Sequence, residues 1–403
     1  MRVLAYTSPA RGHLNPMMGP LLELAARGAE VHVRTLASAV PAVREAGLAC
    51  EPIDPRIEAI EMDDHESRSQ VGAGERAFEV WARRASVEVG DFEAAMATVS
   101  PDLALVDTTT YGAKAVAERE RLRWAESRPF LLEDPAPGMP PFGFGMRPRT
   151  GPLGRLRNAA LARLAARFDV KARLPTANAG RLAAGLPPCA TIADARNRAE
   201  LTLYFTARPF EYQRPMPPGV LMVGAGTWDP PSTLPLEIPE DGRPLALVTC
   251  SSEFQDDGEI AAAALMGLRG DWRTVVTTAG VDPATLPPAR DAIVERFLPH
   301  RPLLERASVV VCHGGMGITQ KALSYGVPVC VVPWARDQLD VAAHVLEAGA
   351  GTKLSRRRLS PGRLANAAQA ARECASGAAR VKAGYEATGS AKAAADAVEA
   401  LLP

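Results

Sequence analysis

The sequence predicts an α/β protein made of two doubly wound, Rossmann-like domains that face each other across a cleft. The chain opens on an apolar strand-like run at 3–7, then an apolar helical stretch, then a second strand-like run at 29–36. Strand, helix and strand in this order form a unit of parallel sheet. A second series of this kind begins at Leu245, and a Pro-rich stretch over 208–243 separates the two series.

The domain boundaries follow from length and composition. A chain of 403 residues exceeds what one hydrophobic core usually organises, so two domains are the default. We expect a first domain over 1–207, a linker over 208–243 and a second domain over 244–385. The last segment, 386–403, is mostly an Ala-rich helix, which we expect to cross back and pack on the first domain.

The first domain places two ionisable side chains near strand ends. Asn15 and Pro16 suit the N-cap and first position of a helix, and this boundary leaves His13 in the loop before it. A buried strand at 103–106 ends at Asp107. Because the carboxyl ends of parallel strands carry the ligand sites of such sheets, we expect both side chains to face one site.

A stretch dense in Pro and Gly follows over 133–152, with the sequence EDPAPGMPPFGFGMRPRTGP. It cannot form a helix or a central strand, so we expect a loop that carries Phe142 and Phe144. Residues 154–186 return to a helical composition. In the second domain we expect strands at 245–249, 274–278, 308–312 and 327–332.

Composition excludes several classes of protein. The 46 Lys and Arg residues balance the 46 Asp and Glu residues, which argues against a nucleic-acid partner. The 6 cysteines lie far apart without a C-x-x-C pair, as in a reduced cytoplasmic chain. No signal peptide, no transmembrane segment and no amphipathic helix with a basic face is evident, so we expect a cytoplasmic monomer or homodimer.

The turn His313-Gly314-Gly315 joins an expected strand to a helix. Glycines let a ligand approach the backbone, and the helix start offers free N–H groups and the positive end of its dipole. This arrangement suits a diphosphate, although it is neither the dinucleotide fingerprint nor the P-loop pattern. The bare turn is equally consistent with a tight strand-to-helix connection.

His13 and Asp107 are candidates for proton transfer. An imidazole can take a proton from a substrate hydroxyl. A neighbouring carboxylate can fix the tautomer of the imidazole and stabilise the imidazolium that forms. The alternative is that His13 caps its helix and Asp107 caps the following turn.

The stretch 296–344, RFLPHRPLLERASVVVCHGGMGITQKALSYGVPVCVVPWARDQLDVAAH, resembles the donor-binding signature of family 1 glycosyltransferases with the GT-B fold. A weaker resemblance to the bacterial natural-product members, of antibiotic, macrolide and enediyne type, covers nearly the whole chain. The resemblance implies an enzyme that moves a sugar from a nucleotide diphosphate to a small apolar acceptor. It also implies that the first domain binds the acceptor and the second the donor.

The resemblance implies donor contacts for a set of residues: Ser251, Ser252, Phe297, Leu298, His313, Gly314, Gly315, Gly317, Ile318, Asp337 and Gln338. Phe297 matches the aromatic that stacks on the pyrimidine, and Leu298 the backbone near the base edge. His313 and the following amides match the diphosphate contacts, with Ser252 at the β-phosphate. Asp337 and Gln338 match the pair that binds sugar hydroxyls.

Three positions depart from the family pattern. Ile318 replaces the usual Ser or Thr, so we expect only its N–H at phosphate, with Thr319 supplying the hydroxyl. Lys321 replaces the Glu that binds ribose hydroxyls of uridine donors in many members. We therefore expect a dTDP-sugar, typically a deoxysugar, to be preferred over a UDP-sugar. His300 replaces the usual Gln, without a consequence that we can derive.

The resemblance also implies inversion at the anomeric carbon, with His13 as base and Asp107 as its partner. No D-x-D motif is present, so we expect neither a metal ion nor another cofactor. Phe142, Phe144 and Trp81 are candidates for an apolar aglycone pocket, or alternatively loop and core anchors. A nucleotide-sugar epimerase of the same fold and a non-catalytic auxiliary homologue remain the rival functions.

Overall fold

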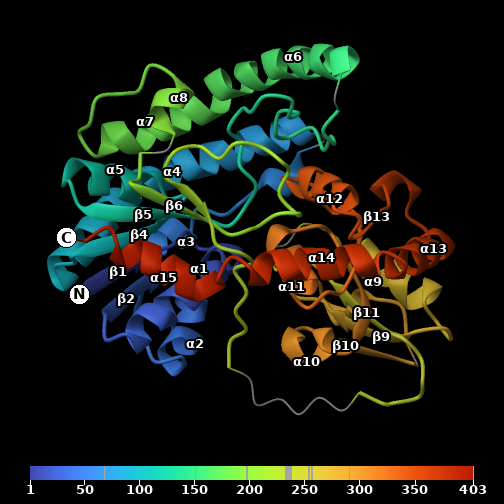
Figure 1. Cartoon of the computed structure of the whole chain (residues 1–403). Coiled ribbons are helices and arrows are strands. Elements are labelled where there is room, and N and C mark those ends of the chain that lie inside the picture. Colours follow the sequence, from blue (N-terminus) through green and yellow to red (C-terminus); the bar gives the residue numbers. More distant parts are fainter. Residues whose placement is uncertain are drawn as a thin grey trace.

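The structure is a computed structural model that describes residues 1–67, 69–149, 151–196, 198–231, 238–252, 255, 257–289 and 291–402. Figure 1 shows two α/β units side by side, the first in blue to green and the second in yellow to red. Each unit has a central sheet with helices on both faces.

The strands of the first sheet are β1 (Arg2–Tyr6), β2 (Glu30–Thr35), β3 (Ala49–Pro52), β4 (Leu103–Asp107), β5 (Arg123–Arg128), β6 (Leu201–Tyr204) and β7 (Val220–Met222). The strands of the second are β8 (Leu245–Thr249), β9 (Arg273–Thr277), β10 (Ala292–Glu295), β11 (Ala307–Cys312), β12 (Val329–Val331) and β13 (Gly351–Lys353). The expected strands are confirmed to within two residues, whereas β3, β5, β6, β7, β10 and β13 were not anticipated.

The first half carries the helices α1 (Arg11–Ala26), α2 (Val40–Glu45), α3 (Pro55–Glu58), α4 (Gln70–Val99), α5 (Tyr111–Arg119), α6 (Gly151–Phe168), α7 (Leu174–Ala183) and α8 (Ile192–Ala195). The second half carries α9 (Gly258–Gly267), α10 (His300–Leu304), α11 (Met316–Ser324), α12 (Gln338–Glu347), α13 (Pro361–Arg372), α14 (Ala375–Glu386) and α15 (Ser390–Glu399). A π-helical turn, Asp169–Arg173, joins α6 to α7.

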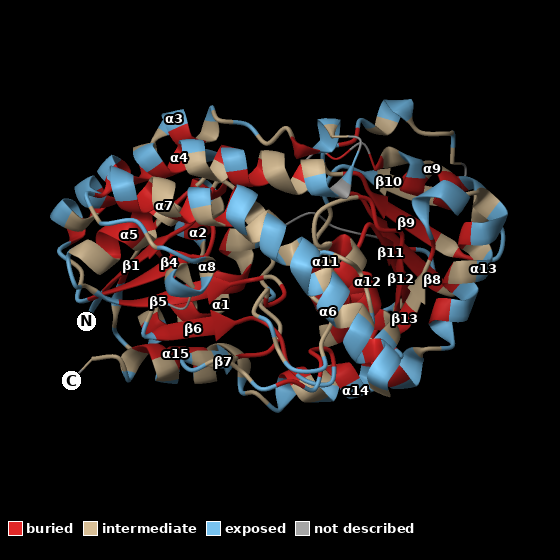
Figure 2. Cartoon of the chain, turned by 90° about the horizontal axis from the view of Figure 1, so that it is seen from above, coloured by how far each residue is buried: buried red, intermediate tan, exposed pale blue. Residues whose placement is uncertain are grey.

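Both sheets are parallel and doubly wound, as the sequence predicted. Their strand orders are β3-β2-β1-β4-β5-β6-β7 and β10-β9-β8-β11-β12-β13. In each sheet the order reverses beside the first strand, between β1 and β4 and between β8 and β11. Ligands bind at such switch points, beyond the carboxyl ends of the strands. The central strands of both sheets are buried, and much of the exposed surface lies on the outer faces of the helices (Figure 2).

Strand β7 lies inside the segment 208–243 and pairs in parallel with β6. Part of the segment suggested as a linker therefore extends the first sheet. The domain boundaries themselves stay a prediction.

Helix α1 starts earlier than expected. It begins at Arg11 rather than at Asn15-Pro16, and both Pro16 and Pro20 lie inside it. Both prolines are buried, so core packing outweighs the hydrogen bonds that their missing N–H groups cost the helix. His13 consequently lies in the first turn of α1 and not in the preceding loop, which corrects the expectation.

The C-terminal helix α15 crosses back to the first domain, as expected. Ala394, Ala395 and Val398 are fully buried in the core cluster formed with β1 and α1. Arg27, at the end of α1, donates to Asp396 at 2.6 Å and to Glu399 at 2.7 Å. Figure 1 shows α15 in red lying beside α1 in blue.

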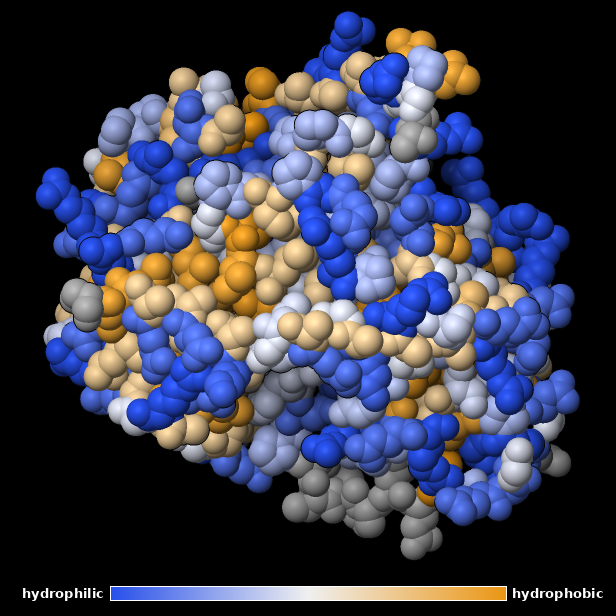
Figure 3. Space-filling view, in the orientation of Figure 1, coloured by the Kyte–Doolittle hydropathy of each residue, from blue (hydrophilic) through white to orange (hydrophobic). Residues whose placement is uncertain are grey.

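Helix α6 presents an exposed face that the sequence analysis did not anticipate. Leu153, Leu156 and Leu164 are 80%, 70% and 49% exposed, and Arg163 and Arg167 lie among them on the exposed surface. Hydrophobic and hydrophilic side chains stand side by side at the top right, where α6 begins (Figure 3). These leucines and arginines share one surface of α6 and are not separated into an apolar and a basic face, so the expectation that no amphipathic helix has a basic face stays a prediction. None of the helices in the described ranges is long and apolar enough to cross a membrane.

Candidate active site

His13 and Asp107 meet at the carboxyl ends of β1 and β4. His13 Nδ1 lies 2.8 Å from Asp107 Oδ1, in the switch point of the first sheet. The His13 side chain is 20% exposed, whereas Asp107 is fully buried. Phe130 packs its ring edge against the imidazole, with 5.8 Å between the ring centroids. The structure thus brings together the two side chains that the sequence placed at separate strand ends.

The surroundings of Asp107 keep it ionised. Its Oδ2 accepts the backbone N–H of Ser8 at 3.1 Å and the hydroxyl of Thr109 at 2.9 Å. Burial alone would raise the pKa of Asp107, but the charge and hydrogen bond of His13 and the donors of Ser8 lower it to about 2. Because the carboxylate can only accept, Nδ1 of His13 must carry the proton. The lone pair then lies on Nε2, the nitrogen on the other side of the ring.

Asp337 of the second half lies close enough to His13 to share its electrostatics. Burial raises the pKa of Asp337 to about 6, while the positive charges of Arg336 and His13 oppose the rise. Arg336 also joins the two halves, because its Nε and a terminal nitrogen donate to the two oxygens of Asp64 at 2.7 and 2.8 Å. The proton-transfer pair therefore faces the segment between β12 and α12.

The turn between β11 and α11 is built for close approach. Gly314 has φ +92°, and a Cβ there would lie 2.5 Å from Val331 Cγ1. A Cβ at Gly315 would lie 2.4 Å from His313 Nε2, so the imidazole covers this backbone. No side chain caps α11, and its first turn holds no acidic residue. Its N–H groups and dipole are therefore available to an anion.

His313 is a neutral, buried member of this turn. It is 7% exposed, and burial together with the charge of Arg336 lowers its pKa to about 4. Its Nδ1 lies 3.6 Å from Asp257 Oδ2, which is longer than a hydrogen bond. Around Gly317, a Cβ would meet nothing within 4 Å, so the chain leaves open space there.

Two of the predicted donor residues are used to join loops. The Nε2 of Gln338 donates to Gln255 at 2.6 Å, and Gln255 in turn donates to the hydroxyl of Ser251 at 3.0 Å. The Oε1 of Gln338 accepts the N–H of Trp334 at 2.6 Å. Gln338 is 1% exposed, and its amide ties the end of β12 to the end of β8. Ser252, by contrast, is exposed.

The residues around Ile318 and Phe297 differ in exposure. Phe297, which follows β10, is 63% exposed, and the neighbouring Leu298 packs against the core of the second half. Ile318 packs on the same core. Thr319 is fully buried with its hydroxyl 3.9 Å from Cys312 Sγ. The expectation that Thr319 offers a hydroxyl to the helix start is therefore wrong.

Lys321 is paired with a carboxylate from the other half of the chain. Its ammonium forms an ion pair with Asp229, in the segment that follows β7. His300 lies alongside, with its Nε2 3.2 Å from the hydroxyl of Thr277. Burial and the charge of Lys321 lower the pKa of His300 to about 4, so this imidazole is neutral.

The aromatic candidates of the first half partly converge. Phe78 packs edge-on against Trp81 at 4.7 Å and against Phe168 at 5.7 Å, measured between ring centroids. The guanidinium of Arg173 lies 5.8 Å from the rings of Phe78 and Phe142. Trp81 and Phe142 thus belong to one cluster, while Phe144 stays half-buried on its loop. Sequence reasoning missed Phe78, although its i, i+3 spacing from Trp81 on a helix places both on one face.

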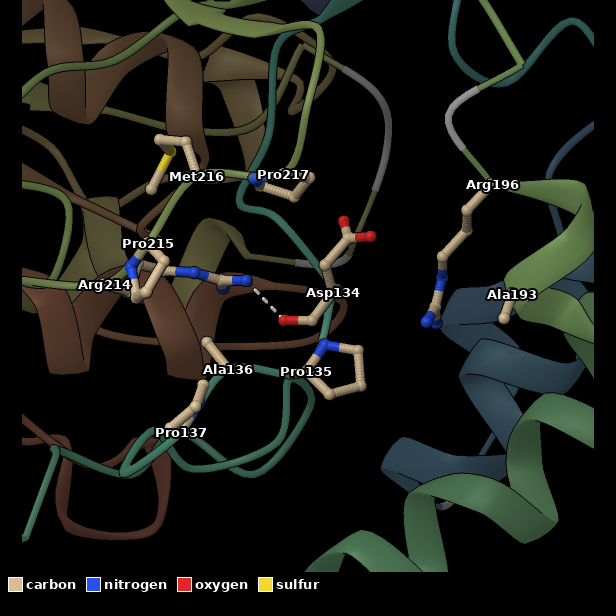
Figure 4. A pocket seen from close by; sticks show the side chains of 10 residues that line it. All are labelled: Asp134, Pro135, Ala136, Pro137, Ala193, Arg196, Arg214, Pro215, Met216 and Pro217. Atoms are coloured by element: carbon tan, nitrogen blue, oxygen red, sulfur yellow. Dashed lines mark hydrogen bonds between the residues drawn. The ribbon is translucent and has the colours of Figure 1, made fainter.

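A cavity of about 340 Å³ lies at the start of the Pro/Gly-rich loop, outside the site described so far. Arg196 lines one side, and Asp134 and Arg214 the other (Figure 4). Arg214 donates to the backbone oxygen of Asp134 at 2.5 Å and so fixes that wall. None of the residues that the sequence predicted for the site lines this cavity.

Comparison with known proteins decides the family. The chain is 31% identical over 375 residues to 4'-demethylrebeccamycin synthase of Lentzea aerocolonigenes, which covers 89% of each chain. This chain belongs to the glycosyltransferases of antibiotic biosynthesis. Residues 272–401 match the family described as erythromycin biosynthesis protein CIII-like, C-terminal domain.

The solved structures similar to this glycosyltransferase have the same fold. The glycotransferase of kitacinnamycin covers 100% of this chain with a TM-score of 0.74 at 22% identity, over 99% of its own length. SnogD from Streptomyces nogalater covers 100% of both chains with a TM-score of 0.69 at 23% identity. The GT-B fold predicted from the donor-binding signature is confirmed, and so is the class of enzyme.

Proposed function

We propose that this glycosyltransferase moves a sugar, typically a deoxysugar, from a dTDP-sugar to an apolar secondary-metabolite aglycone, with inversion and without a metal ion. The observation that carries the proposal is the pair formed by His13 and Asp107, with 2.8 Å between Nδ1 and Oδ1. This pair faces the segment that leads into α12, and the anion-accepting start of α11 lies at the end of the neighbouring strand β11.

In the proposed reaction, Nε2 of His13 takes the proton of the acceptor hydroxyl as its oxygen bonds to the anomeric carbon. The bond from that carbon to the diphosphate oxygen breaks on the opposite face, so the sugar configuration inverts. The leaving diphosphate gains negative charge, which the N–H groups of Gly315, Gly317 and the first turn of α11 would stabilise. Asp107 would stabilise the imidazolium until the proton leaves.

The apolar acceptor is supported by the aromatic side chains near the site. Phe78, Phe142 and Phe168 lie around the guanidinium of Arg173, and Trp81 packs edge-on against Phe78. Flat aromatic molecules bind between such rings. The relative named 4'-demethylrebeccamycin synthase and the erythromycin-type family support an antibiotic-like aglycone.

The preference for dTDP is supported by the pairing of Lys321 with Asp229. A ribose hydroxyl that donated a hydrogen bond to Asp229 would compete with the ammonium of Lys321, which is already paired with this carboxylate. Calorimetric titration of dTDP, dUDP and UDP into the protein tests this, because dUDP differs from UDP only in the 2′-hydroxyl. We expect dTDP and dUDP to bind about fivefold more tightly than UDP, the value of one hydrogen bond.

Lys321→Glu is the matched variant for the same titration. It introduces the carboxylate that many family members carry at this position, so we expect the variant to bind UDP more tightly than dUDP. Stronger binding of UDP to the wild-type protein would keep the transferase and discard the donor preference. Absence of binding by every nucleotide would reject the donor site itself.

Metal independence has its own measurement. In the proposed reaction, α11 and the turn before it stabilise the negative charge of the diphosphate without a metal ion. Transfer should therefore proceed unchanged in excess EDTA. Loss of activity with EDTA that Mg²⁺ or Mn²⁺ restores would contradict it.

A further inference from the structure

One face of α12 joins the second half of the protein to the Pro/Gly-rich loop of the first half. Asp340 Oδ2 accepts the backbone N–H of Gly143 at 2.9 Å, and Oδ1 accepts that of Gly145 at 3.1 Å. The carboxylate is 5% exposed, so these hydrogen bonds are shielded from water. A buried, charge-assisted pair of this kind is stronger than a neutral hydrogen bond at the surface.

The loop lies directly on the start of α12. Gly145 has φ +58°, and a Cβ there would lie 2.6 Å from Leu339 Cβ and 2.9 Å from the Leu339 oxygen. Only glycine permits this approach. Phe142, on the same loop, packs against the core of the second half.

A second contact holds the next part of the loop. The ring of Tyr212 stacks on His344, one turn along α12 from Asp340, with 3.6 Å between centroids and 17° between planes. The Tyr212 hydroxyl donates to the backbone oxygen of Met146 at 3.2 Å. The ion pair of Arg147 with Glu347, at 2.6 Å, is different in kind, because its side chains are 56% and 38% exposed. Exposed pairs of this kind contribute little.

We propose that Asp340 is a positioning residue that holds the loop 133–149 on α12 and thereby sets Phe142 and Phe144 for the acceptor. We call Asp340 with the two amides of Gly143 and Gly145 the loop latch. The inference rests on the proposed function, because that function assigns the loop to the acceptor. Since Asp340 lies on α12 of the second half and its partners lie on the loop of the first half, the loop latch makes acceptor binding depend on contact between the two halves.

Hydrogen–deuterium exchange of the peptide 142–149 reads the loop latch directly. Asp340→Asn keeps the shape of the side chain but leaves only one oxygen to accept from the N–H groups of Gly143 and Gly145. The NH₂ group of the asparagine then faces the second N–H, to which it cannot hydrogen-bond. We expect exchange in this peptide to become about tenfold faster, as for the loss of a charge-assisted hydrogen bond. Glu347→Gln, on the same helix and facing the same loop, is the matched control and should change exchange less than twofold.

Gly145→Ala disturbs the same contact from the side of the loop and leaves Asp340 intact. It should also speed exchange, and the double variant Asp340→Asn/Gly145→Ala should be no faster than the faster single variant. Non-additivity of this kind identifies one shared contact. Fully additive effects, or unchanged exchange in Asp340→Asn, would overturn the loop latch.

Ligand titrations separate positioning from general stability. We expect Asp340→Asn to weaken binding of 7-hydroxy-4-methylcoumarin, a flat fluorescent alcohol, about tenfold, while dTDP binding stays within twofold. Unchanged coumarin affinity despite faster exchange would overturn the acceptor role, as would a wild-type protein that binds no coumarin. Failure of the proposed function would show separately, as absent dTDP binding by the wild-type protein, and the exchange measurement does not depend on it.

Discussion

Replacing His13 with Ala should lower kcat for transfer to an alcohol acceptor by about 10³-fold, within the range for a general base. The hydrogen bond from Nδ1 to the ionised Asp107 fixes the lone pair on Nε2, and the variant removes the only group of the pair that can take a proton. The dissociation constant for dTDP should stay within twofold, because the anion site is formed by α11 on the other half of the chain. Steady-state kinetics and calorimetry on the same preparation measure both.

The chain offers a matched control for this variant. His32 Nε2 also lies 2.8 Å from a carboxylate oxygen, that of Glu30, but this pair lies toward the amino end of β2, away from the carboxyl ends of the strands where the site is. His32→Ala should keep kcat within twofold of the wild type. Full transfer by His13→Ala would remove His13 as the base, and weakened dTDP binding would give it a role in closing the two halves.

The fold could be predicted from the sequence because its signals are local. Buried strands such as β4 and β8 are continuous apolar runs, and their alternation with helices fixes a parallel sheet. Strand β10 was missed because it is half-buried and its apolar run is only three residues long, Ala292-Ile293-Val294. The start of α1 was misplaced because a local rule for proline gave way to the packing of Pro16 in the core.

The residues of the site likewise divide into those that local sequence signals could place and those that they could not. His13 and Asp107 could be paired from sequence because both follow strands that neighbour each other at a switch point. Gln338 could not be placed, because its partners Gln255 and Trp334 are set by loops that meet only in the folded chain. Asp340 gave no signal either, since its partners are backbone N–H groups that precede it by 197 and 195 residues in the chain.

The carboxylate of Asp107 decides which nitrogen of His13 is basic, and this makes Asp107→Asn more damaging than its small change in shape suggests. The N–H of Ser8 can only donate, and it points at Oδ2. An asparagine would therefore turn its oxygen toward Ser8 and its NH₂ toward His13. Nδ1 would then have to accept, and the proton would move to Nε2.

We therefore expect Asp107→Asn to lower kcat by about 10² to 10³-fold, nearly as much as loss of the base itself. Because the pKa of Asp107 is about 2, protonation of Asp107 does not contribute to the acid limb of the wild-type rate profile above pH 4. That limb should be lost or displaced in the variant. Asp91→Asn is the control: this buried carboxylate accepts the Tyr6 hydroxyl at 2.8 Å, so its loss should lower stability and leave kcat unchanged. An Asp107→Asn enzyme with the wild-type rate and profile would leave Asp107 a structural role only.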